Sequence, residues 1–133
     1  MQRIRPALPR RTPLFSRMPG TELPRPFREL LTLLPLVPTD AQGGIDWAAA
    51  PPEVLVRLAD AAEMAQRVIN LGVSAIGTLL AYAAPEIETG EVSANTVEAL
   101  AWLLAELGDG AAMCFELLAL CRQHTADYRG HKA

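Results

Sequence analysis

Aromatic residues are scarce in this chain of 133 residues, which has two tryptophans, two tyrosines and three phenylalanines. Alanine and leucine supply most of its apolar side chains instead. A β-sandwich would need more valine, isoleucine, threonine and aromatic residues on its pleated surfaces, so the composition argues against that class. Small apolar side chains favour helices that pack closely. The length suits one domain with one modest core.

Cysteine is almost absent, because the chain has only Cys114 and Cys121. On one helix, two turns separate their Cα atoms by ~10 Å, which is beyond the span of a disulfide. Two unpaired thiols favour a reducing cytosol over a secreted scaffold. The first residues also lack the apolar stretch and cleavage site of a signal peptide. We therefore expect a cytoplasmic protein.

The basic residues are concentrated at the start of the chain. Residues 1–28 hold seven arginines and one acid, whereas residues 29–133 hold five bases and fourteen acids. Residues 1–26 also contain six prolines, which remove backbone donors and disfavour a helix. The sequence predicts an extended, Arg/Pro-rich arm over residues 1–26 and a helical domain over residues 27–133. Richness in alanine and arginine with a single lysine further suggests a bacterial source with a GC-rich genome.

The most regular stretch covers residues 95–128. Its apolar or small side chains recur in steps of three and four residues, namely Val97, Leu100, Leu104, Leu107, Ala111, Cys114, Leu118, Cys121, Thr125 and Tyr128. This spacing is that of one face of an α-helix. Gly108 and Gly110 favour a turn locally, but the apolar phase continues through them. We predict one continuous helix, in which close approach of another helix offsets the cost of the glycines.

A second long helix is predicted over residues 52–83. Its apolar stripe consists of Leu55, Leu58, Ala62, Ala65, Ile69, Gly72, Ile76, Leu79 and Ala83. Proline suits the first turn at Pro51 or Pro52, and Pro85 is expected to end the helix. A short helix over residues 27–34 is too short to be stable alone and is expected to dock on a larger element.

Residues 86–94 form the connection between the long helices, with Gly90 as the natural turn residue. Asn95 and Glu98 have the spacing of a capping box. A connection this short makes the two helices antiparallel and adjacent. The predicted fold is therefore all-α: a long antiparallel helical hairpin, bundle-like and open to completion by dimerisation, with an extended basic, proline-rich N-terminal arm.

Several apolar residues fall outside the two stripes. Because two helices cover only one side of each other, these residues need the short helix, a second copy of the chain or a different protein. A symmetric four-helix dimer is the simplest solution. The predicted helix-face interface consists of Val68, Leu71, Val73, Leu80, Trp102, Phe115 and Leu120.

Residues 68–85 carry no charge and have about the minimum length of a membrane span. However, they include Asn70, Ser74 and Thr78, and they belong to a longer amphipathic pattern. We therefore interpret them as a buried core helix.

No set of residues supplies a nucleophile, a base and an oxyanion donor, so we expect no enzyme and no catalytic residue. Cys121 and His124 could share a metal ion, but a structural zinc site needs four ligands and Cys114 lies two turns away. We expect neither a metal nor a cofactor. Glu86, Glu88 and Glu91 fit a solvated turn better than acid–base chemistry.

The sequence favours a non-enzymatic interaction or regulatory protein that works through its helix faces and its basic arm. Its partner is expected to be a second copy or another protein, with no membrane. The partner-binding residues of the arm are Arg3, Arg5, Arg10, Arg11, Arg17, Arg25 and Arg28. The alternative is a nucleic-acid-associated accessory regulator, in which the arginines neutralise phosphates. The acidic remainder of the chain and the lack of interleaved aromatic residues disfavour this alternative.

Overall fold

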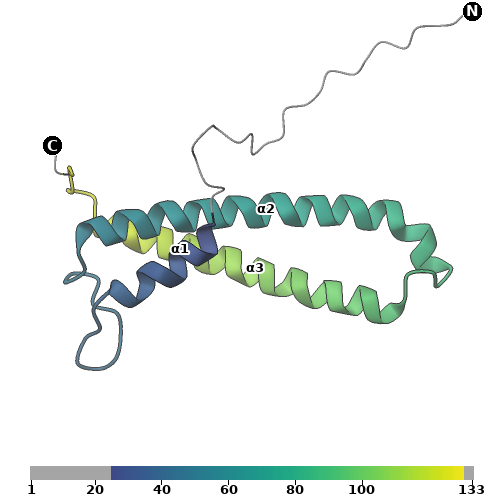
Figure 1. Cartoon of the computed structure of the whole chain (residues 1–133), viewed down its shortest axis with the longest axis horizontal. Helices are drawn as coiled ribbons and strands as arrows, with labels where there is room; N and C mark the ends of the chain where they lie inside the picture. Colours follow the sequence, from purple (N-terminus) through teal and green to yellow (C-terminus); the bar gives the residue numbers. More distant parts are fainter. Residues whose placement is uncertain (1–24, 131–133) are drawn as a thin grey trace, which may run out of the picture.

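The computed structural model describes residues 25–130 and shows a helical hairpin with a short helix on one half of it (Figure 1). The short helix α1 spans Pro26–Leu33 and continues as the 3-10 turn η1, Leu34–Leu36. The long helices α2, Pro52–Glu88, and α3, Ala94–Gln123, lie side by side. Within this part of the chain there is no strand, only an isolated bridge in the loop before α2. The predicted all-α hairpin is confirmed. The arm lies outside the described residues up to residue 24.

Helix α2 begins at Pro52, as predicted, but Pro85 does not end it. The helix continues through Pro85 for three more residues to Glu88. A proline inside a helix removes one hydrogen bond and crowds the preceding turn. Here the carbonyls of the last turn still have donors, because the N–H of Thr89 bonds Pro85 and the N–H of Val92 bonds Glu86. The expected end at residue 83 is therefore one turn short.

Helix α3 runs unbroken through Gly108 and Gly110, which confirms the continuous helix. The expected close approach of another helix is wrong. A Cβ at Gly108 would meet nothing within 4 Å, and one at Gly110 would only touch the Ile69 side chain at 3.7 Å. The helix also ends at Gln123, before the predicted residue 128. There Thr125 Oγ1 donates to the Cys121 carbonyl at 2.8 Å, so a side chain bonds a carbonyl of the last turn.

The N-terminus of α3 is capped by Ser93 and not by the expected Asn95. The Ser93 Oγ accepts the backbone N–H of Thr96 at 3.2 Å. Asn95 instead lies within the first turn, where its side chain is exposed. A helix that starts at Ala94 has its free N–H groups two residues earlier than a cap at Asn95 implies, so Ser93 is the residue in reach of one of them.

Replacing Ser93 by alanine is expected to lower the free energy of unfolding by about 1 kcal/mol, because the N–H of Thr96 loses its acceptor. Asn95→Ala is the matched control and should change stability by less than about 0.5 kcal/mol. Urea denaturation of both variants checks this. A larger loss for Asn95→Ala would show that Asn95 is the cap.

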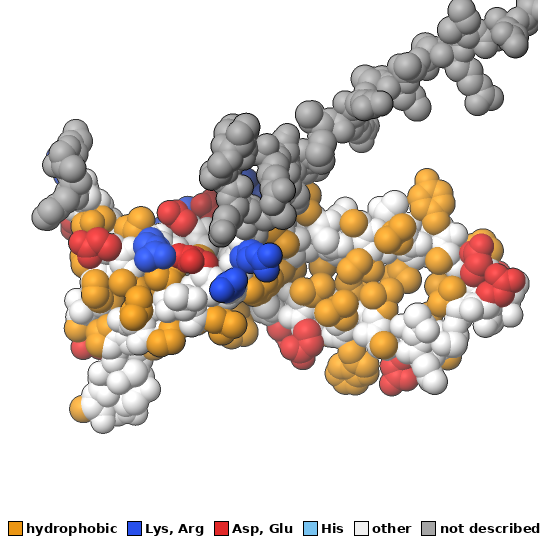
Figure 2. All heavy atoms as spheres, viewed as in Figure 1, with side chains coloured by type: hydrophobic (Ala, Val, Ile, Leu, Met, Phe, Trp, Pro, Cys, Tyr) orange, Lys and Arg blue, Asp and Glu red, His pale blue; other side chains and the backbone are white. Residues whose placement is uncertain are grey.

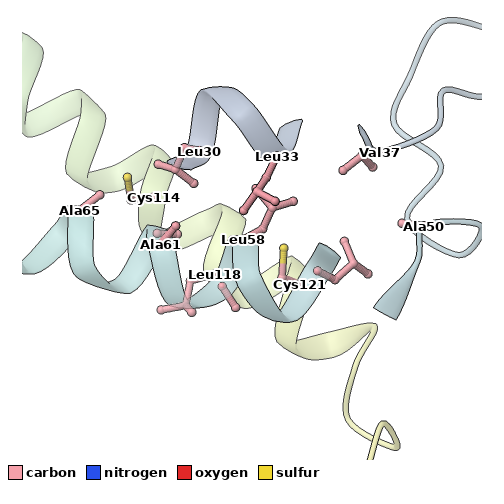
Figure 3. Packing of buried hydrophobic residues seen from close by; sticks show 13 residues of the cluster. Leu30, Leu33, Val37, Ala50, Leu58, Ala61, Ala65, Cys114, Leu118 and Cys121 are labelled. Atoms are coloured by element: carbon pink, nitrogen blue, oxygen red, sulfur yellow. The ribbon is translucent and has the colours of Figure 1, made fainter. Parts of the chain in front are cut away.

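The core lies in one half of the hairpin, where α1 covers the start of α2 and the end of α3. Figure 3 shows Leu30 of α1 beside Ala61 and Cys114, and Leu33 beside Leu58. Exposed ion pairs join the elements of this packed half: Arg57 pairs with Glu29 of α1, and Arg122 with Glu63 of α2. The buried apolar residues are Leu30, Leu33, Val37, Ala50, Leu55, Leu58, Ala59, Ala61, Ala62, Ala65, Ile69, Cys114, Leu118 and Cys121.

Candidate interaction surface

Among the described residues, no element covers the half of the hairpin that ends in the turn. None of residues 70–113, all of which the structure describes, is buried. Helix α1 has eight residues and is ~12 Å long, whereas α2 has 37 residues and is ~55 Å long, so α1 reaches only part of the hairpin. We call residues 70–88 of α2 and 94–113 of α3 the distal half. Each helix there has only the other to pack against.

The apolar segment of α2 lies in this distal half. Helix α2 is long and apolar enough to cross a membrane, by length and composition alone. Its most apolar window is only 6% buried, so the interpretation of residues 68–85 as a buried core helix is wrong for this single chain. The reason is that α1 has only eight residues, so the buried part of α2 ends at Ile69.

One side of the distal half continues the side on which α1 lies. The ion pair between Arg57 and Glu29 shows on which side of α2 the helix α1 lies. Ala61 comes one helical turn after Arg57 and is therefore on the same side of α2. Eighteen residues make five helical turns, so Leu79 points to the same side as Ala61. On α3, Leu103 lies eighteen residues before the fully buried Cys121 and shares its direction.

Leu79 and Leu103 therefore repeat the core positions under α1, but no element of residues 25–130 covers them. Leu79 is 68% exposed and Leu103 48% exposed. Smaller side chains lie on the same side: Ala75 on α2, Ala99 and Gly110 on α3, and Val68, which precedes the distal half on α2 by two residues. We call these six residues the distal face. Figure 2 shows hydrophobic side chains gathered along and between the two helices in this half of the molecule.

Charges of opposite sign bound the distal face at its two ends. Arg25 and Arg28 are exposed at the start of α1, near the middle of the hairpin, and Figure 2 shows basic side chains there. At the turn, Glu86, Glu88 and Glu91 are exposed, and acidic side chains cover that end of the molecule. None of these five residues forms an ion pair with another residue of the described range.

The structure spreads the seven predicted interface residues over several sides of the hairpin. Leu71, Trp102 and Phe115 are exposed, whereas the other four are half-buried: Val68, Val73, Leu80 and Leu120. Phe115 is twelve residues from Leu103 and thus about 120° away around α3. Only Val68 belongs to the distal face. Of the arm residues, only Arg25 and Arg28 lie within the described residues, and both are exposed.

In the distal half, four exposed large apolar residues were not among the predicted interface: Leu79, Tyr82, Leu103 and Met113. Leu79 was expected in the buried stripe, and its exposure corrects that expectation. The length of the predicted short helix was the available signal. Eight residues cover about two turns, so a stripe of nine positions on a long helix had to extend past them.

Neither cysteine offers a reactive site. Both thiols are free and buried, as predicted for Cys114 and Cys121. Burial raises the pKa of the Cys114 thiol, and it raises the pKa of Cys121 to about 11. Within residues 25–130 no group of three or more His, Cys, Asp or Glu residues could hold a metal ion.

Comparisons with known protein families, with curated proteins and with solved structures give no match.

Proposed function

We propose that this chain is a non-enzymatic interaction protein of the cytoplasm, which binds a protein partner through the distal half of its hairpin. The observation that supports the proposal is the contrast between the two halves of one hairpin. The same helices are buried where α1 covers them and exposed where it does not. Exposed large apolar residues in a contiguous region are typical of interaction surfaces.

The proposal also fits the chemistry of the surface. Binding by helix faces needs apolar side chains at a regular spacing. The distal face has steps of seven and four residues on α2 (Val68, Ala75, Leu79) and of four and seven on α3 (Ala99, Leu103, Gly110). Membrane insertion fits less well, because α3 carries Glu106 and Asp109 beside the apolar segment of α2. A charged residue is expensive in the hydrocarbon region.

Replacing Leu79 and Leu103 together by glutamate is expected to weaken partner binding about tenfold or more, because charges would then enter an apolar contact. The double variant Leu36→Glu with Ile45→Glu is the matched control. Those two residues are 55% and 43% exposed and lie at the opposite end of the molecule, before α2. The control should bind as the original chain does.

Two measurements test this. The mass of the purified chain in solution shows whether it self-associates, and purification from the source cell shows which protein binds it. Circular dichroism confirms that both double variants remain helical. The proposal is supported when self-association, or one defined co-purifying protein, is lost in the Leu79 and Leu103 variant and kept in the control. It is contradicted when the original chain shows neither association, or when the two double variants lose it equally.

Binding of nucleic acid by the arm is the second candidate, and the charge of residues 1–28 is the observation that favours it. Seven acids and no base lie between Arg67 and Arg122, which would repel a polyanion from the hairpin. A salt series with DNA and RNA tests it, since phosphate contacts make the logarithm of the binding constant fall linearly with that of the salt concentration.

A further inference from the structure

We propose that the partner on the distal face is a second copy of this chain, packed antiparallel so that each turn abuts the start of the other copy's α1. This inference rests on the proposed function and names its partner. Three properties of the surface support it: its charge pattern, the step formed by α1 and its area.

The charge pattern of the surface is complementary to itself. The apolar distal face lies between a basic end, Arg25 and Arg28, and an acidic end, Glu86, Glu88 and Glu91. A two-fold axis that lies in the plane of the face, perpendicular to the long helices and through the middle of the face, brings the two faces together and exchanges these ends. Each acidic turn then meets the arginines of the other copy, twice in one dimer. A parallel arrangement would instead bring two acidic turns together, which like charges disfavour.

The sequence before Arg25 is also basic, like Arg25 and Arg28 themselves. Residues 1–24, which precede Arg25 in the sequence, contain five arginines and one acid. No basic residue occurs from residue 68 to residue 121, so the charged residues of the distal half are all acids. A second copy of this chain therefore carries both the positive charge that complements the acidic turn and the negative charge that complements the arginines.

Helix α1 sets the position of the second copy. It forms a layer on one side of α2 and α3 over the packed half, and no other helix of the described range continues that layer over the distal half (Figure 1). In the antiparallel dimer, the distal half of one copy fills the layer that α1 of the other leaves open. The start of α1 then acts as a stop, and the four long helices form a bundle across the distal halves.

The area is sufficient for a specific contact. Twenty residues of helix are ~30 Å long, and two adjacent helices are ~20 Å wide, which gives a face of ~600 Å² on each copy. Two such faces bury ~1,200 Å², the lower end of the range for specific protein interfaces. The opposite side of the distal half is a weaker surface, because it presents mainly small residues such as Ser74, Gly77, Ala101 and Ala105.

Charge reversal in the full-length chain tests both the partner and its orientation. One variant carries Arg25→Glu and Arg28→Glu, and the other carries Glu86→Arg, Glu88→Arg and Glu91→Arg. Each alone should raise the dissociation constant of the dimer roughly tenfold, because like charges then meet at both ends. An equimolar mixture should form a heterodimer with a dissociation constant within about threefold of the original. Sedimentation equilibrium over a concentration series, at low and high salt, measures all three.

Every other outcome overturns the inference. A chain that stays a monomer overturns it, as does a dimer whose charge variants fail to restore binding when mixed. Sedimentation of the monomer with neutral phosphatidylcholine vesicles would identify a membrane as the occupant. A different protein that binds the monomer, and is lost only in the Leu79 and Leu103 variant, would overturn the dimer and leave the proposed function intact.

Discussion

Replacing Leu58 by alanine is expected to lower the free energy of unfolding by about 2–5 kcal/mol. Leu58 is fully buried in the packed half, where α1 and α3 both lie against α2. The substitution removes three of the four side-chain carbons and leaves a cavity that the surrounding helices close only in part. A domain of this size has ~5–15 kcal/mol of stability in total, so a large share would be lost.

Leu79→Ala is the matched control, because it makes the same chemical change on the same helix at a residue that is 68% exposed. In dilute solution, where the chain is alone, it should change stability by less than about 0.5 kcal/mol. Urea denaturation of both variants measures the difference. Equal losses at Leu58 and Leu79 would mean that the distal half is buried in the isolated chain, contrary to this structure.

Much of the fold could be predicted from the sequence because it depends on local patterns. Three-four spacing identifies both long helices, and its unbroken phase correctly carries α3 through Gly108 and Gly110. The ends were less predictable. Pro85 favours an end at residue 83, yet the last turn keeps its hydrogen bonds. At the start of α3, Ser93 and Asn95 both have suitable side chains, and only the backbone shows which one caps.

The candidate surface was harder to predict, because exposure depends on what covers a helix and not on its own sequence. Ala61 and Leu79 occupy the same direction on α2, but only Ala61 lies under α1. The periodicity of the sequence therefore cannot distinguish the buried residue from the exposed one. The apolar residues outside the two stripes did indicate that the hairpin alone leaves apolar surface exposed. The side of the hairpin that is exposed follows from the Glu29–Arg57 pair, which joins residues far apart in the sequence.

The thiol of Cys121 is expected to react with an aromatic disulfide reagent at least 100-fold more slowly than an exposed thiol at about pH 8. Its pKa is raised from 9.0 to about 11 by burial, so roughly 100-fold less thiolate is present, and the side chain is fully buried. The matched control is Ala119→Cys in a chain whose own cysteines are replaced by alanine, because Ala119 is exposed two residues away on α3. Comparable rates at the two sites would show that the packed half opens freely.

The same pKa shift makes stability depend on pH in a defined direction. The folded chain holds the Cys121 proton more tightly than the unfolded chain, so unfolding becomes easier as the thiol loses its proton. The contribution is fully present below about pH 9 and is lost as the pH rises through about 11. Urea denaturation between these pH values measures it, and Cys121→Ala should flatten the decline although it lowers stability overall. An unchanged slope in that variant would show that other groups cause the pH dependence, and that the Cys121 thiol is not held in the core between α1, α2 and α3.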